Sequence, residues 1–169
     1  WLNDGIAFGH SRLLQVADDE HDWFSFGDVS ELPLGDLDVI LMRKDPPFDT
    51  EYIYASYILE QAEAAGALVV NKPASLRDAN EKAFTAWFPQ CTAPTLISRD
   101  MQRLRAKVEE HGDAIVKPLD GMGGASIFRL REGDPNIAVV LETLTNHGQH
   151  YAIVQQFIPD ISNGDKRIL

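Results

Sequence analysis

The sequence lacks several features that define large protein classes. It has one cysteine, Cys91, among 169 residues, which excludes a disulfide network within the chain and a zinc site made of cysteines. Its apolar runs are too short to cross a membrane as a helix. Its five histidines are scattered, and none has the spacing of a metal site. A lone thiol fits a reducing compartment, so we expect a cytoplasmic protein with no membrane partner.

Positive charge is also scarce. The sequence has 15 lysines and arginines against 26 aspartates and glutamates, which gives a net charge of −11. Duplex nucleic acid and anionic membranes bind basic surfaces, so we expect neither as the main partner. An acidic protein can still hold an anion in a locally basic pocket. The apolar fraction of 44% is ordinary for a folded globular chain.

The first part of the sequence has the pattern of a parallel α/β unit. Residues 37–42 form a short apolar run, typical of a strand buried on both faces. Residues 50–65 predict a helix that Thr50 caps, and residues 67–70 predict a second strand. Strand, helix and strand in this order predict a right-handed βαβ unit.

A stiff, charged loop with the sequence RKDPPFD follows the first of these strands, at residues 43–49. Its two prolines fix the backbone and hold Arg43 and Lys44 near the end of the strand. Ligands bind beyond the carboxyl ends of strands in such sheets. A solvated loop is the simpler alternative, but this stiffness beside concentrated charge favours a binding role somewhat.

The second part of the sequence has a different pattern. A helical connector is expected from residue 73, with its helix continuing to about Phe88. From residue 92 the order is β-α-β-β-α-β, the split βαβ plan. We therefore predict four segments: a first unit at residues 1–72, a connector at 73–91, a compact α+β subdomain at 92–158, and the start of another subdomain at 159–169.

The stretch VKPLDGMGGAS, residues 116–126, is the most informative motif. Lys117 ends a strand, and the glycines at 121, 123 and 124 are expected to turn the backbone with positive φ. Successive N–H groups in such a loop form an anion-binding nest, and the preceding lysine supplies a compact charge for phosphate. The loop lacks the ending of a P-loop. On these residues alone, a flexible hairpin turn and a phosphate-binding loop are about equally good interpretations.

Three further candidates are weaker when taken alone. Lys82 fits an ordinary surface lysine. Residues 155–158 end a strand whose backbone could bind an adenine edge, although strand packing explains them better. Asp165 and Arg167 fit a charged turn, in which the acid could hold ribose hydroxyls and the arginine a carboxylate or phosphate.

Four segments taken together resemble the bacterial glutathione synthetases, a family of ATP-grasp ligases. The segments are DVILMRKDPPFD, VVNKPASLRDANEK, AIVKPLDGMGGASIF and NGDKRIL, in the family's order between about Trp23 and Leu169. The resemblance implies an α/β fold: a partial parallel βαβ N-terminal (pre-ATP-grasp) unit followed by a split βαβ, or α+β, ATP-grasp lid subdomain.

The resemblance implies an ATP-dependent carboxylate–amine ligase. Members of the family join γ-glutamylcysteine to glycine with ATP and Mg²⁺, through an acyl phosphate on the cysteinyl carboxylate of the dipeptide. The implied partners are these two small molecules, and the parent protein is expected to form a homo-oligomer.

The resemblance also assigns the site residues. Gln156 and Phe157 stand where the family often has asparagine and tyrosine, so a side-chain hydroxyl contact would be lost there but backbone recognition would remain. Arg167 is the catalytic candidate, and Arg43 and Lys44 are the candidates for peptide binding. The expected ATP contacts are Lys82 and Lys117 on the phosphates, Gly121, Met122, Gly123 and Gly124 in a flap, Gln155, Gln156, Phe157 and Ile158 around adenine, and Asp165 at the ribose.

The metal-binding acids of the family and much of its glycine site fall beyond Leu169, so no metal ligand is expected in this chain. By the same resemblance, the first strand and helix of the family are also expected to lie outside this chain. We therefore expect an internal piece of the enzyme that lacks both ends and is inactive alone. Two alternatives stay open: a related ATP-grasp ligase with another acceptor, and a nucleotide-binding module without catalysis.

Overall fold

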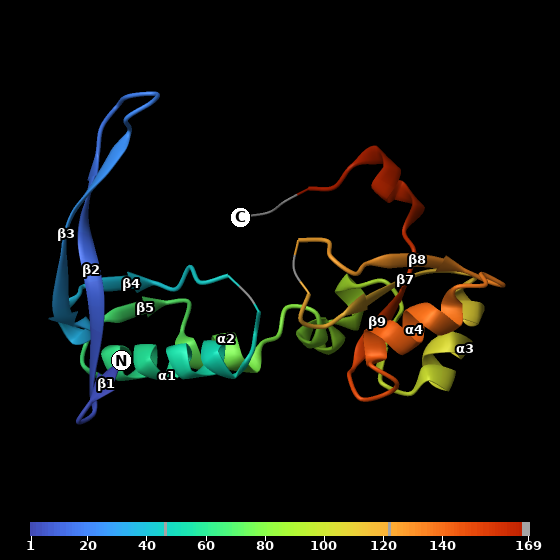
Figure 1. Ribbon diagram of the computed structural model, residues 1–169. Coiled ribbons are helices and arrows are strands. Elements are labelled where there is room, and N and C mark those ends of the chain that lie inside the picture. The colour runs from blue at the N-terminus through green and yellow to red at the C-terminus, as the bar shows by residue number, and fades with distance from the viewer. Residues whose placement is uncertain (46, 122, 167–169) are drawn as a thin grey trace. The chain divides into compact units, whose positions relative to one another are not determined.

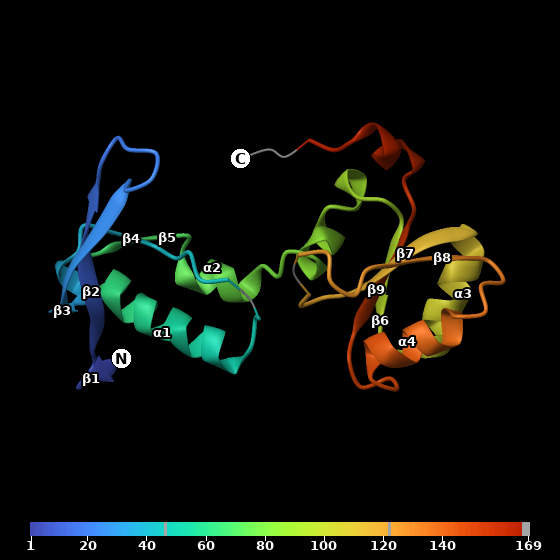
Figure 2. The same cartoon turned by 45° about the horizontal axis from the view of Figure 1, so that its top comes forward.

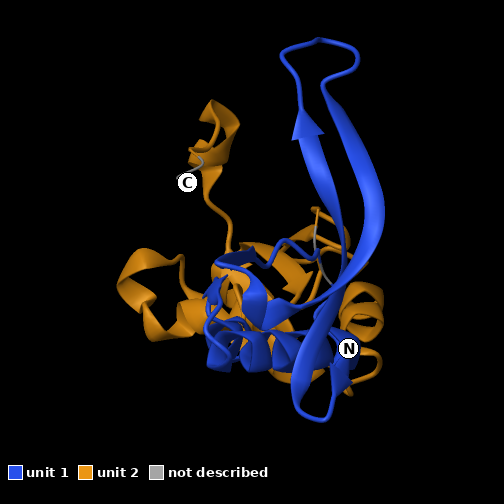
Figure 3. Cartoon of the chain, turned by 90° about the vertical axis from the view of Figure 1, so that its left-hand side faces the viewer, with its two compact units in different colours: residues 1–78 blue, residues 79–169 orange. Residues whose placement is uncertain are grey.

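The structure, a computed structural model, describes residues 1–45, 47–121 and 123–166. The chain divides into two compact units, Trp1–Asp78 and Ala79–Leu169 (Figure 3). Each unit has its own sheets and helices (Figure 1). In the described part of the chain, no helix has the length and apolar character needed to span a bilayer.

The first unit begins with an antiparallel ribbon. Strand β1 (Leu2–Asn3) pairs with β2 (Ile6–Val16), which pairs along most of its length with β3 (Phe24–Pro33). The register shifts between Arg12 and Leu14, which marks a β-bulge. The far end of this ribbon projects away from the other elements of the unit (Figure 1). A 3₁₀ turn, η1 (Leu34–Asp36), leads out of the ribbon.

The predicted βαβ unit is confirmed. Strands β4 (Val39–Leu41) and β5 (Leu68–Val70) pair in parallel, with Ile40 opposite Val69, and helix α1 (Thr50–Ala64) connects them. The helix begins at Thr50 as predicted, but Thr50 is not its cap: the Asp49 carboxylate accepts the hydrogen bond from the backbone N–H of Tyr52 at 2.9 Å.

Burial of the first predicted strand on both faces is wrong. Val39 is 52% exposed and Leu41 is 60% exposed, and their neighbours Leu68 and Val70 on β5 are exposed as well. The sheet has two strands, so α1 can cover one face of it, and nothing in the described part of this unit covers the other. A short apolar run therefore predicted the strand correctly but not its surroundings.

The predicted connector helix is also shorter than expected. Helix α2 (Pro73–Asp78) has six residues, and the chain continues as two 3₁₀ turns, η2 (Ala83–Trp87) and η3 (Pro89–Cys91). The side chain of Asn80 forms hydrogen bonds with the next turn of backbone, which competes with helix formation. The division into units falls after Asp78. The finer four-segment boundaries stay a prediction.

The second unit is a four-stranded antiparallel sheet with two helices (Figure 2). Its elements follow the predicted order, and its strands lie in the order β6-β9-β7-β8. Each helix thus joins two strands that have a third between them, which confirms the split βαβ plan. The elements are β6 (Thr95–Ser98), α3 (Met101–His111), β7 (Asp113–Pro118), β8 (Phe128–Arg131), α4 (Ile137–Thr145) and β9 (Ala152–Gln156), followed by η4 (Pro159–Asn163).

Alternation along β7 gives the two faces of this sheet different roles. Ala114 and Val116 are fully buried in a core that α3 and α4 share with the strands. Ile115 and Lys117 point to the opposite face because successive side chains on a strand alternate. Both are half-buried, and both line a pocket on that face. The core-forming pattern therefore fixes where Lys117 projects.

Truncating the core should cost far more than truncating the surface of the same unit. Leu104 on α3 is fully buried, so Leu104→Ala should lower the free energy of unfolding by about 2–5 kcal/mol. Val139→Ala on α4 is the control: Val139 is 54% exposed, and its truncation should change the free energy by about 0.5 kcal/mol or less. Urea titrations followed by circular dichroism measure both, and equal losses would contradict the assigned core.

Candidate functional site

The glycine loop between β7 and β8, residues 119–127, has two kinds of glycine. Gly123 and Gly124 have φ angles of +66° and +78°, as predicted for a left-handed turn. The same expectation for Gly121 is wrong. A Cβ there would lie 2.8 Å from Cγ of Pro118, so Gly121 is needed for close packing, not for an unusual φ. At Gly123 and Gly124 no described atom beyond the adjacent residues lies within 4 Å of the place that a Cβ would take, so the backbone there can come close to a ligand.

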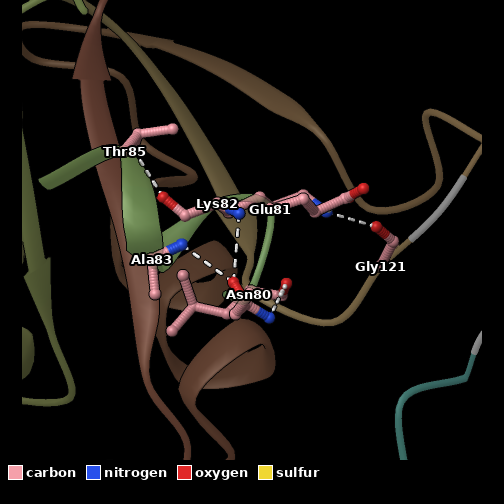
Figure 4. A network of polar contacts seen from close by, with 7 residues as sticks. Asn80, Glu81, Lys82, Ala83, Thr85 and Gly121 are labelled. Atoms are coloured by element: carbon pink, nitrogen blue, oxygen red, sulfur yellow. Dashed lines mark hydrogen bonds and ion pairs between the residues drawn. The ribbon is translucent and has the colours of Figure 1, made fainter. Parts of the chain in front are cut away.

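Lys82 reaches this loop from another part of the chain. Its ammonium group donates a hydrogen bond to the Gly121 carbonyl at 2.6 Å and another to the Glu81 carboxylate at 2.6 Å (Figure 4). Its side chain is 15% exposed. The expectation of an ordinary surface lysine, made from the residue alone, is therefore wrong. The structure brings together two residues that the sequence separates by 39 positions.

Asn80, which was not predicted from the sequence, holds the turn that carries Lys82. Its Oδ1 accepts hydrogen bonds from the backbone N–H groups of Lys82 and Ala83, at 3.0 and 2.8 Å (Figure 4). Its Nδ2 donates to the Leu119 carbonyl at 3.4 Å, at the start of the glycine loop. An asparagine that bonds to backbone two and three residues onward is a known turn signal, but the predicted helix concealed it.

Lys117 lies in the same electrostatic environment. Partial burial and, next, the positive charge of Lys82 lower the pKa of Lys117, while Glu81 opposes this shift. Both causes penalise the charged ammonium group, and an anion bound between the two lysines would relieve them. The site therefore has two positive groups that favour a polyanion.

A pocket of about 430 Å³ adjoins Lys117 on the face of the sheet opposite the helices. Its lining is mostly apolar, which suits a flat aromatic ring more than a charged group. It includes Ile115, Ile127, Phe157, Ile158 and Ile161, together with Cys91, Thr92, Ala93, Lys117, Gln155 and Gln156.

The backbone of the hinge segment, residues 155–158, offers hydrogen-bonding groups to this pocket. The Gln156 N–H donates to the Pro94 carbonyl at 3.0 Å, but proline has no N–H to return the bond to the Gln156 carbonyl. The Phe157 N–H is taken by the Asp113 carbonyl at 3.0 Å. Ile158 has its N–H on the same side as Gln156, because extended backbone alternates, and no protein acceptor bonds to it in the described part of the chain.

For two other expected ATP residues, Gln155 and Asp165, the structure shows no side-chain contact with the lysines or the glycine loop among the described residues. The side chain of Gln155 donates to the Thr95 hydroxyl at 2.9 Å, which ties β9 to β6. Asp165 is exposed after η4 and is not among the residues that line the pocket. The structure thus brings together Lys82, Lys117, Gly121 and the hinge segment, but it does not add Asp165 to them.

The remaining candidates lie elsewhere. Arg43 and Lys44 are exposed in the first unit, after β4 as predicted, and the two units are described separately. Met122 and Arg167 lie outside the described residues. Their roles, like those of the other site residues, stay predictions.

Comparison with known proteins gives the family. The family described as "Prokaryotic glutathione synthetase, ATP-grasp domain" matches residues 81–169, and "Prokaryotic glutathione synthetase, N-terminal domain" matches residues 1–77. The chain belongs to the prokaryotic glutathione synthetase family. The two matched segments meet where the structure divides into units.

Curated relatives in this family are close in sequence. The glutathione synthetase of Vibrio vulnificus (strain CMCP6) is 60% identical over 168 residues, which cover 99% of this chain and 53% of the relative. That of Escherichia coli (strain K12) is 60% identical over 169 residues, 100% of this chain and 54% of the relative. The chain therefore spans about half the length of the curated relatives it matches.

Solved structures support the fold. A D-cycloserine synthetase has a TM-score of 0.56 at 16% identity, over 77% of this chain and 47% of that one. The D-alanyl-alanine synthetase A of Vibrio cholerae has a TM-score of 0.55 at 14% identity, over 87% and 44%. Together with the family match, these likenesses confirm the predicted ATP-grasp fold.

The charge environment of Lys117 can be tested by titration. Lys82→Met should raise the pKa of Lys117, because it removes a like charge, whereas Glu81→Gln should lower it further. Between its lowered pKa and the ordinary value of 10.5, Lys117 has lost its proton in the folded chain but still holds it in the unfolded chain. The free energy of unfolding should therefore rise with pH across this window. NMR titration of the Lys117 Cε resonance measures the pKa. No change in either variant would show that the three groups are not coupled.

Proposed function

We propose that this chain is the part of a glutathione synthetase that binds ATP and contributes to the peptide site. The observation that supports this most is the pairing of Lys82 and Lys117 beside the glycine loop, next to an apolar pocket. Use of ATP, typically with Mg²⁺, is a property of the ATP-grasp family to which the chain belongs. The whole protein would join γ-glutamylcysteine to glycine.

In this proposal each part of the site has one task. Lys82 and Lys117 hold the phosphates of ATP, and the backbone N–H groups of residues 121–124 cover them. The Gln156 carbonyl and the Ile158 N–H bind the edge of adenine, which lies against the apolar wall. Asp165 binds the ribose, and Arg167 contacts phosphate or substrate.

The chemistry is one of positioning and charge neutralisation. The cysteinyl carboxylate of γ-glutamylcysteine attacks the γ-phosphorus of ATP, and ADP leaves. The glycine amine then attacks the acyl carbon, phosphate leaves with the bonding electrons, and the amine gives up one proton to the departing phosphate or to water. The lysines stabilise the charge that develops on the transferred phosphoryl group and hold the reactants in line.

Two further assignments complete the proposal, one for the peptide site and one for the whole protein. Arg43 and Lys44 would contact the peptide substrate, and the whole protein would be a cytoplasmic homo-oligomer. The described residues contain no group of three or more histidine, cysteine, aspartate or glutamate residues that could hold a metal ion, so we assign no magnesium ligand to them.

Measuring ADP release by the intact parent protein tests this function directly. ADP release should require both γ-glutamylcysteine and glycine, and the 169-residue chain alone should bind ADP but release none from ATP with these substrates. Coupled measurement of ADP, with each substrate omitted in turn, distinguishes the cases. Equal turnover with another amine in place of glycine would point to a different ATP-grasp ligase.

Lys117 should be essential to this reaction. Lys117→Met in the parent should lower kcat/KM about 10²- to 10³-fold, because it removes one group that stabilises transition-state charge. Lys107→Met is the matched control. Lys107 is a lysine on α3 that pairs with Glu110 and lies outside the site, so its loss should change kcat/KM less than about twofold. Equal kcat/KM values for the two variants would contradict the proposed role of Lys117.

A further inference from the structure

Arg129 joins three strands at the edge of the pocket. From β8, its guanidinium group donates two hydrogen bonds to the carboxylate of Asp113 on β7, Nε to Oδ1 at 2.8 Å and Nη2 to Oδ2 at 2.6 Å. The same group lies over the ring of Phe157, just after β9, with its central carbon 3.5 Å from the ring centroid. Such a planar contact combines cation–π attraction with stacking.

Asp113 holds Phe157 in two ways. Its backbone carbonyl accepts the Phe157 N–H at 3.0 Å, and its carboxylate fixes the arginine that covers the ring. The hydrogen bonds from Arg129 are the main cause of a lowered pKa of Asp113, so the carboxylate stays ionised at neutral pH. We call these three residues, Asp113, Arg129 and Phe157, the Arg129 clamp.

The hinge segment needs such a clamp because its own sheet pairing is incomplete. Pro94 cannot donate a ladder hydrogen bond to the Gln156 carbonyl, and β9 ends at Gln156. A strand end that lacks ladder bonds frays more easily than the sheet interior. The same missing bond leaves the Gln156 carbonyl open to a ligand. The position that is best suited to bind a base is therefore also one that the sheet holds weakly.

We propose that Arg129 is a positioning residue for base recognition: by fixing Phe157, it holds the Gln156 carbonyl and the Ile158 N–H in the geometry that an adenine edge requires. This inference rests on the proposed nucleotide site. Preorganised groups bind more tightly because less freedom is lost on binding. The contribution of Arg129 should therefore appear in affinity for the base, not for the phosphates.

Two probes separate these contributions in the intact parent protein: ADP, which has the base, and inorganic tripolyphosphate, which does not. Arg129→Met should raise the Kd for ADP about fivefold, the size expected for losing a cation–π contact whose arginine is 41% exposed. The Kd for tripolyphosphate should change less than about twofold. In turnover, the KM for ATP should rise while kcat changes little.

Arg131→Met is the matched control. Arg131 lies on the same strand and approaches the same Asp113 carboxylate at 3.6 Å, but no stacking on Phe157 is found for it among the described residues. Arg131→Met removes the same positive charge as Arg129→Met, so it measures how much of the change in Kd comes from charge alone. Its Kd for ADP should stay within about twofold of wild type.

Three outcomes would overturn the inference. Arg129→Met could leave the Kd for ADP unchanged, it could weaken both probes equally, or Arg131→Met could have the same effect as Arg129→Met. If Arg129→Met does not fold, Arg129→Lys keeps the charge and loses the planar contacts, and it should still raise the Kd for ADP at least threefold. Wild-type protein that binds ADP no better than tripolyphosphate would instead refute the proposed adenine pocket, and the inference with it.

Discussion

Two ammonium groups that share one electrostatic environment beside a glycine loop are the constraint on which the rest of the site depends. Lys82 is mostly buried against the Gly121 carbonyl, and Lys117 has a pKa lowered by burial and by Lys82. Glu81 offsets part of this repulsion. Such an arrangement is costly without an anion, so an anionic ligand would stabilise it. The loop supplies backbone groups at the same place without adding charge.

The sheet of the second unit makes this arrangement possible. Helices α3 and α4 bury one face, so alternate residues of β7 are committed to the core. The residues between them, Ile115 and Lys117, project to the other face, where the apolar pocket adjoins the lysine. The proposed base and phosphate sites thus follow from one strand. The Arg129 clamp joins the neighbouring strands to the hinge segment at the end of this pocket.

Much of the fold could be predicted from local pattern. The βαβ unit and the β-α-β-β-α-β order were correct, because each element is set by apolar periodicity and by turn residues nearby. Two of the errors have local physical causes. Asp49 displaced Thr50 as the cap of α1, and the hydrogen bonds of Asn80 ended the expected connector helix. The predicted burial of β4 failed because burial depends on what lies across the sheet.

The sequence by itself determined the elements, the family resemblance and the candidate lysines and glycines, because these depend on neighbouring residues and on motifs. The tertiary structure alone decided which of them meet. Lys82 reaches Gly121 across 39 positions, and Arg129 meets Asp113 across 16 and also covers Phe157. No local pattern encodes such contacts, because they exist once the strands have paired in their register and the core has fixed which way each side chain points.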